Sequence, residues 1–124
     1  MEILCPVSLG ELLDKISILR IKQQRIKDPD KLTHIAVELE RLTRAAGSLE
    51  PYGQFLEEFQ KVNEALWDIE DAIRRKEKAQ QFDEEFIRLA RWVYRTNDQR
   101  FEIKNDVNRR FGSAIQEQKS YEKY

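Results

Sequence analysis

The chain of 124 residues has one cysteine, one histidine, four glycines and three prolines. Cys5 alone excludes an intramolecular disulfide, and with the single His34 it leaves too few ligands for a His–Cys metal site. No apolar run reaches the length of about 20 residues that a membrane-spanning helix needs. No signal-peptide pattern is present either, so we expect a reducing cytoplasm and no membrane insertion.

An excess of either charge is also lacking. Lys and Arg number 22 against 23 Asp and Glu, and charged residues make up 36% of the chain. A protein that binds nucleic acid normally carries a basic patch and a basic balance, so the composition predicts no nucleic-acid partner. Dense, balanced charge with few Gly and Pro is typical of helices with solvated faces.

Sequence motifs of common catalytic sites are missing. The chain has no glycine-rich phosphate loop, no paired cysteine motif and no nucleophile elbow, and it has no histidine beside a nucleophile. The sequence therefore predicts no cofactor and no bound metal. It names no reaction, and whether the protein is an enzyme stays open.

Apolar residues recur at helical spacing along most of the chain, and local signals mark where helices begin and end. Ser8 and Glu11 form a capping box, Asp28-Pro29 and Asp83 suit helix starts, and Gly47 suits a helix end. We predict helices near 8–27, 29–46, 54–78 and 83–111, an extended lead-in over 1–7 and a polar tail over 113–124. The expected fold is all-α, a four-helix up-down bundle of two helical hairpins in a single domain, 1–124.

The first helix is apolar on two faces, because Ile18 and Ile21 lie away from its main stripe. Two interpretations are open. The lead-in or the tail could cover these side chains, or a second subunit could. The second interpretation predicts a homodimer through the first helix.

The fourth helix has polar residues in the middle of its apolar stripe, where Asn97, Arg100 and Lys104 occupy inward positions. Up-down pairing of the helices brings other polar residues beside them. We call the whole set the polar seam, and it is our candidate ligand-binding site: Asp14, Lys15, Asn63, Glu70, Asn97, Arg100 and Lys104.

The polar seam has two interpretations. In a structural network, Asp14 and Glu70 neutralise Arg100 and Lys104, and the asparagines fix the register of the helices. In an anion pocket, Lys15, Arg100 and Lys104 gather because a carboxylate or phosphate offsets their repulsion. The sequence leaves both interpretations open.

Acidic residues follow helical spacing on the third helix at Glu64, Asp68 and Asp71. A solvated surface explains them most simply. Carboxylates spaced in this way could also hold a divalent metal, so a metal-dependent nucleotide pyrophosphohydrolase is kept as a distant alternative.

Several strings carry a resemblance that spans nearly the whole chain. They are Ser8–Ile16, Asn63–Asp71 with the pattern Asn-Glu-x-Leu-Trp-Asp-Ile-Glu-Asp, Tyr94–Asp98 with the pattern Tyr-x-Thr-Asn-Asp, and Lys119–Tyr121. In these strings the chain resembles an uncharacterised family of small bacterial helical proteins, a domain of unknown function. The resemblance implies an all-helical domain and no particular activity.

From the residues themselves, we expect a non-enzymatic helical interaction or accessory module, because they make up no complete catalytic constellation. Such a module implies a protein partner. The alternative is a protein or enzyme that binds an anionic metabolite at Arg100 and Lys104.

Overall fold

The computed structural model describes residues 1–124 and contains four α-helices and no strand, which confirms the all-α prediction. One short connection joins the two helices of each hairpin, and a single 3₁₀ turn links the hairpins. The elements are α1 (Leu9–Arg25), α2 (Pro29–Ala46), η1 (Glu50–Tyr52), α3 (Gly53–Lys78) and α4 (Glu84–Arg110).

Helix ends follow local sequence. Ser8 Oγ accepts a hydrogen bond from the Glu11 N–H at 3.1 Å, and Asp83 accepts one from the Phe86 N–H at 3.0 Å. Asp28 caps α2, whose first residue is Pro29. These side chains satisfy backbone N–H groups that have no partner within the first turn of a helix. The starts of three helices were therefore predictable from a few neighbouring residues.

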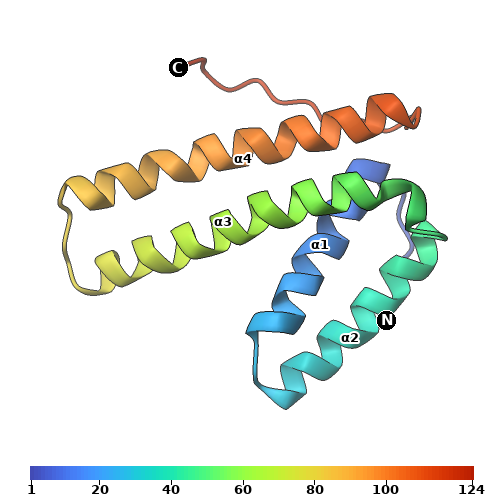
Figure 1. The fold of residues 1–124 in the computed structure, drawn as a ribbon, viewed down its shortest axis with the longest axis horizontal. Helices are drawn as coiled ribbons and strands as arrows, with labels where there is room; N and C mark the ends of the chain where they lie inside the picture. Colours follow the sequence, from blue (N-terminus) through green and yellow to red (C-terminus); the bar gives the residue numbers. More distant parts are fainter.

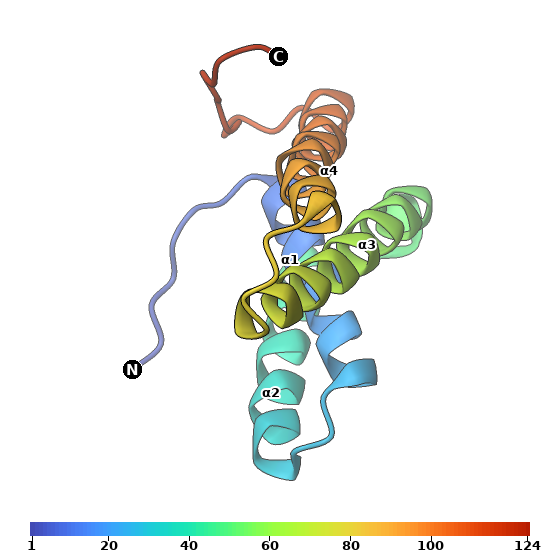
Figure 2. The same ribbon diagram turned by 90° about the vertical axis from the view of Figure 1, so that its left-hand side faces the viewer.

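The two hairpins cross each other instead of lying side by side along their whole length (Figures 1 and 2). Helices α3 and α4 form a long antiparallel pair, and α1 and α2 form a shorter pair that leaves it at one end (Figure 1). Helix α1 contacts the three other helices, whereas α2 packs mainly on α1. The first hairpin thus reaches the second chiefly through α1.

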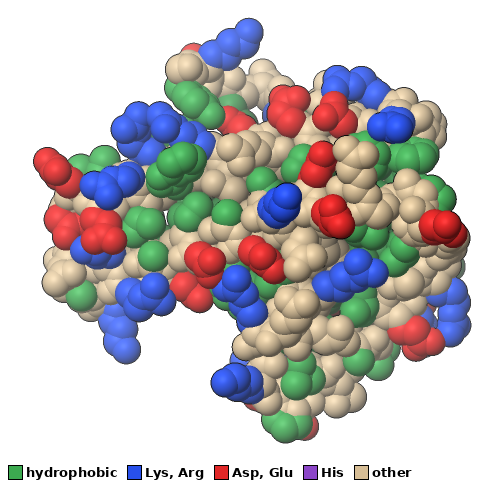
Figure 3. Space-filling model, in the orientation of Figure 1, with side chains coloured by type: hydrophobic (Ala, Val, Ile, Leu, Met, Phe, Trp, Pro, Cys, Tyr) green, Lys and Arg blue, Asp and Glu red, His purple; other side chains and the backbone are tan.

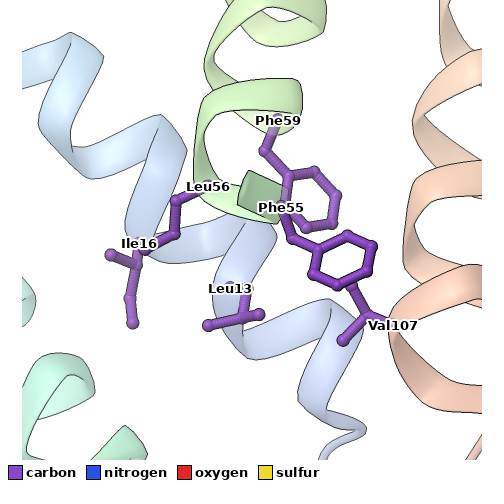
Figure 4. Packing of buried hydrophobic residues seen from close by; sticks show 6 residues of the cluster. All are labelled: Leu13, Ile16, Phe55, Leu56, Phe59 and Val107. Atoms are coloured by element: carbon purple, nitrogen blue, oxygen red, sulfur yellow. The ribbon is translucent and has the colours of Figure 1, made fainter. Parts of the chain in front are cut away.

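The hydrophobic core lies where α1 crosses α3 and α4 (Figure 4). Phe59, Leu13, Ile16 and Val107 are fully buried there. Phe55 and Leu56 complete the cluster, and Leu39, Leu42 and Ala46 of α2 pack against its edge. This core holds α1 against the other hairpin and so sets the position of the polar seam.

The half of the α3/α4 hairpin that extends past α1 and α2 has no buried residue (Figure 1). We call residues 64–95 the outer arm. The buried residues of α3 all lie between Phe55 and Asn63, and those of α4 between Thr96 and Asn108. In the outer arm Phe82 is 54% exposed, Ile87 55% and Trp92 43%. Helix α1 contacts the outer arm only at its base, near Leu66, Trp67 and Asp68, and no third helix covers the rest. The apolar side chains toward the tip therefore remain partly open to water.

The premise of a dimer through the first helix was wrong in one respect. Ile21 is buried within the chain, and Ile18 is half-buried beside it. Both line a groove with Leu66 and Trp67 of α3, so α3 covers the second apolar face of α1. A homodimer itself stays a prediction, but Ile21 no longer motivates it.

Candidate functional site

The centre of the polar seam is an ion pair between α1 and α4. Asp14 is fully buried, and Arg100 donates to both of its carboxylate oxygens. The distances are 2.9 and 3.0 Å from Nε and 2.6 Å from Nη2. A bidentate pair of this kind fixes orientation as well as charge. Asp14 therefore neutralises Arg100 within the protein.

Helix α3 joins the same pair through Asn63, which is 5% exposed. Asn63 Nδ2 donates to Asp14 Oδ1 at 2.9 Å and approaches Ser17 Oγ at 3.5 Å. The Asp14 carboxylate thus accepts hydrogen bonds from two different helices. Since an unpaired carboxylate would be costly to bury, these bonds make its burial possible.

Lys104, which is 7% exposed, has two carboxylate partners. Its Nζ lies 3.3 Å from Glu11 Oε2 in α1 and 2.9 Å from Glu117 Oε2 in the C-terminal segment. Glu70 is not among them, because it pairs with Arg74 one turn along α3. The prediction that Glu70 neutralises the seam cations was therefore wrong.

The pKa values of both cations show how the carboxylates act. Burial lowers the pKa of Arg100, but its hydrogen bonds to the Asp14 carboxylate and the negative charge of Asp14 outweigh burial and raise the pKa above its ordinary value. Burial likewise lowers the pKa of Lys104, and Glu117 together with Glu11 and Asp14 raises it overall. Both side chains are accordingly held in their charged forms by internal partners.

The start of α1 approaches α4 very closely at Gly10. Its N–H donates to Asn108 Oδ1 at 2.8 Å, and Asn108 is completely buried. A Cβ atom at Gly10 would lie 2.6 Å from the Lys104 carbonyl oxygen and 2.9 Å from its Cα. Only glycine fits at this contact. Asn108 Nδ2 is buried without a hydrogen-bond partner.

Two of the predicted seam residues lie outside this network. Lys15 is exposed and approaches only Glu11, at 4.0 Å. Asn97 is half-buried and takes part in none of the seam hydrogen bonds. The cluster of three cations that an anion pocket requires is therefore not formed, because Lys15 points to solvent.

The candidate site predicted from sequence leaves out several members of the seam: Gly10, Glu11, Ser17, Asn108 and Glu117. Two signals could have found some of them. A glycine in the first turn of a helix indicates a close backbone approach, and Glu11 and Ser17 are spaced by three residues on either side of Asp14. Glu117 had no such signal, because its contact depends on the path of the C-terminal segment.

The predicted polar tail lies back along α4 (Figure 1). Tyr124 donates to Asp98 at 2.7 Å, and its ring meets the Tyr94 ring edge to face at 5.1 Å. The bond to Asp98 raises the pKa of Tyr124. Lys119 lies over the Phe101 ring at 5.5 Å. The tail therefore covers one flank of α4.

A groove of about 270 Å³ borders the seam, between α1 and α3. Its apolar wall is formed by Ile18, Ile21, Leu66 and Trp67, and Arg100 reaches it from α4. The remaining charged groups are one cation and two carboxylates: Lys22, Glu70 and Asp71. Asp14 engages Nε and Nη2 of Arg100, so this cation reaches the groove already paired.

The acidic residues of α3 do not form a metal site. No group of three His, Cys, Asp or Glu side chains in the chain is arranged to hold a metal ion. Asp68 instead pairs with Arg25 of α1, and Glu64 accepts a hydrogen bond from Gln60. The carboxylates of a metal-dependent pyrophosphohydrolase are thus not brought together.

None of the helices combines the length and the apolar character that crossing a bilayer requires.

Comparison with known families gives one result. The model of a family of unknown function, DUF6165, matches residues 3–124, almost the whole chain. The chain belongs to DUF6165. This confirms the resemblance to an uncharacterised domain family. No curated protein and no solved structure matches the chain significantly. The DUF6165 assignment therefore carries no activity, and function has to be argued from the residues.

Proposed function

We propose that this DUF6165 protein is a non-enzymatic helical interaction module that docks another protein on its outer arm. The proposal is supported above all by the contrast between the two halves of the α3/α4 hairpin. The inner half buries its apolar side chains against α1, whereas the outer arm leaves Phe82, Ile87 and Trp92 more than 40% exposed. The cytoplasmic location expected from the sequence is part of the same proposal.

The state of the polar seam also supports a module over an enzyme. A catalytic site needs a group that is free to bind or react with a substrate. Here Asp14 engages Arg100, while Glu11 and Glu117 engage Lys104. These ion pairs hold α1, α4 and the tail in register, and the hydrogen bond from Asn63 to Asp14 adds α3. The seam then serves to position the outer arm.

Photo-crosslinking in cells tests the module. A photo-reactive phenylalanine analogue replaces Trp92 on the outer arm or, as the matched control, Val37 on the exposed face of α2, where exposure is 52%. We expect a discrete covalent adduct from position 92 and none from position 37. Equal labelling at both positions, or none at position 92, would overturn the proposal.

A second candidate is the binding of a small anion beside Arg100. One observation favours it: Asp14 engages Nε and Nη2 of Arg100, which leaves Nη1 for another partner, and Arg100 borders the groove. In this candidate a carboxylate or phosphate contacts Nη1 while its apolar part lies on Leu66 and Trp67.

Thermal denaturation with phosphate, citrate and phenylpyruvate separates this candidate from the module. A bound anion raises the melting temperature, and the rise increases with anion concentration. Arg100→Lys removes the effect, because lysine has a single nitrogen and cannot pair with Asp14 and present a separate Nη1 to the anion. An unchanged melting temperature at millimolar concentrations of all three anions would remove the candidate.

A further inference from the structure

The two long flanks of the outer arm differ in what covers them. Tyr94 faces the tail, where Tyr124 packs on it. Trp92 is two residues away on the same helix and so points to the opposite side, and it stays 43% exposed. Figure 3 shows apolar side chains open between α3 and α4 along the outer arm, with charged side chains around them. One face of the arm is therefore free.

We propose that the outer arms of two copies of this chain pack antiparallel through the face that carries Trp92, so that four helices surround a shared apolar layer. The inference rests on the proposed function and names the partner of the same surface. Two helices alone bury little apolar surface, and a second pair is the usual way to complete such a core. The choice of a second copy over another protein comes from the order of charges along each helix.

Along α3 the charges change sign from the base of the outer arm to its tip. The segment nearer the base is acidic, and the segment nearer the tip is mainly basic, with Glu77 as its one acidic member. The acidic residues are Glu64, Asp68, Glu70 and Asp71, and the basic residues are Arg74, Arg75, Lys76 and Lys78. An antiparallel copy of α3 sets each segment beside its opposite, whereas a parallel copy sets like charges together.

Along α4 the order of charges is the reverse. Asp83, Glu84 and Glu85 lie at the tip, and three arginines lie nearer the base at Arg88, Arg91 and Arg95. An antiparallel copy of α4 again sets acidic residues beside basic ones. A two-fold axis perpendicular to the arm packs α3 against α3 of the second copy and α4 against α4 of the second copy. The same rotation therefore sets opposite charges side by side on both helices.

The two helices also agree on where that axis lies. Within the chain, Lys76 of α3 contacts both Asp83 and Glu85, so it lies level with the start of α4. Because α3 and α4 are antiparallel, a residue four positions before Lys76 lies level with a residue four positions further along α4, which pairs Ala72 with Arg88. Pairing Asp68 with Arg75 of the second copy centres α3 between Asp71 and Ala72.

On α4, pairing Glu85 with Arg95 of the second copy places the centre at Ala90. That level is about one to two residues, or roughly 2 to 3 Å, from the centre on α3. The same centre brings Arg88 over Trp92 of the second copy, a favourable cation–π contact.

Several of these groups have unused bonding capacity within one chain. Arg75, Arg88 and Arg95 form no intramolecular ion pair. The Arg95 guanidinium lies 5.9 Å from the Trp92 ring, beside the face that the second copy would cover. Asp68 bonds Arg25 through Oδ1, which leaves Oδ2 for a second cation. A second copy would supply the missing partners.

Sedimentation velocity on the full chain, up to millimolar concentration, tests the dimer. We expect Trp92→Glu to raise the dissociation constant by about thirtyfold or more, as loss of a central aromatic does. Val37→Glu is the matched control, since Val37 is 52% exposed on α2 and lies outside the outer arm. Wild-type protein that stays monomeric, or equal effects of the two substitutions, would overturn the inference.

A charge exchange tests the antiparallel register. Arg75→Glu makes the α3 face acidic at both positions, and Asp68→Arg makes it basic at both, so each variant alone should dimerise more weakly than wild type. An equimolar mixture should recover the dimer mass, because opposite charges meet again at both ends. Lack of recovery in the mixture would contradict this register even if the wild type dimerises.

Failure of this inference can be told apart from failure of the proposed function. A crosslinked adduct at position 92 with the mass of two chains supports both. An adduct of another mass, together with monomeric wild-type protein, would keep the interaction module and reject the second copy as its partner.

Discussion

At the scale of single residues, Asp14 and Arg100 show that the charges of the polar seam are paired within the protein. Asp14 has no exposed surface, and the Arg100 side chain retains 25% of its exposure. Removing one member of a buried pair costs more than the pair contributes, because the other charge is left without compensation in a poorly solvated place. The sign of a mutational effect therefore distinguishes a structural pair from cations that wait for a ligand.

Arg100→Met should destabilise the protein by about 3 kcal/mol, the typical cost of breaking a buried ion pair. Urea denaturation measures this change. Arg20→Met is the control, since Arg20 is exposed on α1 and should shift stability by no more than about 0.5 kcal/mol. A more stable Arg100→Met variant would mean that repulsion at an empty anion site dominates.

Lys104 makes stability depend on pH at the alkaline end. Its folded-state pKa is raised above the ordinary 10.5, so its contribution is complete below pH 10.5 and is lost as pH rises through the folded-state value. Lys104→Arg keeps the charge over this range. The difference in unfolding free energy between the variant and wild type should stay constant below pH 10.5 and grow in favour of the variant above it. A difference that is flat with pH would contradict this role for Lys104.

At the scale of elements, the contact between α1 and α4 decides how the hairpins cross. The backbone of α1 at Gly10 lies against the backbone of α4 at Lys104. The Asn108 side-chain oxygen accepts a hydrogen bond from the Gly10 N–H, which has no partner within the first turn of α1. The Asp14–Arg100 pair lies one turn further along α1. Close approach and polar bonds together set the crossing point, around which the apolar core packs.

Gly10→Ala should therefore cost about 1 to 3 kcal/mol, as overpacking does, because the new methyl group would meet the Lys104 backbone. Gly53→Ala provides the control, since Gly53 has helical φ and no atom within 4 Å of an added Cβ. There the substitution should be neutral or stabilise by about 0.4 to 1 kcal/mol. Equal effects at the two glycines would refute the close contact.

At the scale of the whole molecule, α1 makes the chain one cooperative unit, since it touches every other helix. The outer arm has no buried residue, so it has too little packing of its own to stay folded when α1 unfolds. The single domain predicted over 1–124 therefore implies a single unfolding transition when the protein is dilute.

Two tryptophans can follow this transition separately. Trp67→Phe leaves Trp92 as a probe of the outer arm, and Trp92→Phe leaves Trp67, beside Arg25 of α1, as a probe of the crossing. Fluorescence and circular dichroism should give one midpoint within each variant. If Trp92 fluorescence changes at a lower midpoint than the circular dichroism signal, the outer arm unfolds before the rest of the protein.

Helix starts were predictable from the sequence, whereas the partners of the buried cations were not. Helix starts at Ser8, Asp28 and Asp83 depend on side chains that cap the backbone two or three residues away, so a short stretch of sequence suffices. Burial of Arg100 and Lys104 followed in the same way from their helical spacing. Their partners did not, because Asp14, Glu11 and Glu117 are far away along the chain.

The sequence alone therefore determined the four helices, the two hairpins and a polar interruption on the inward face of α4, since each depends on residues close together in the chain. Only the tertiary structure decided that α1 crosses α3 and α4 near Gly10, that Glu70 pairs with Arg74 instead of the seam cations, and that the outer arm has no buried residue. Helical spacing sets the direction of a side chain around its own axis, and the angle between two helices depends on how close their backbones can come.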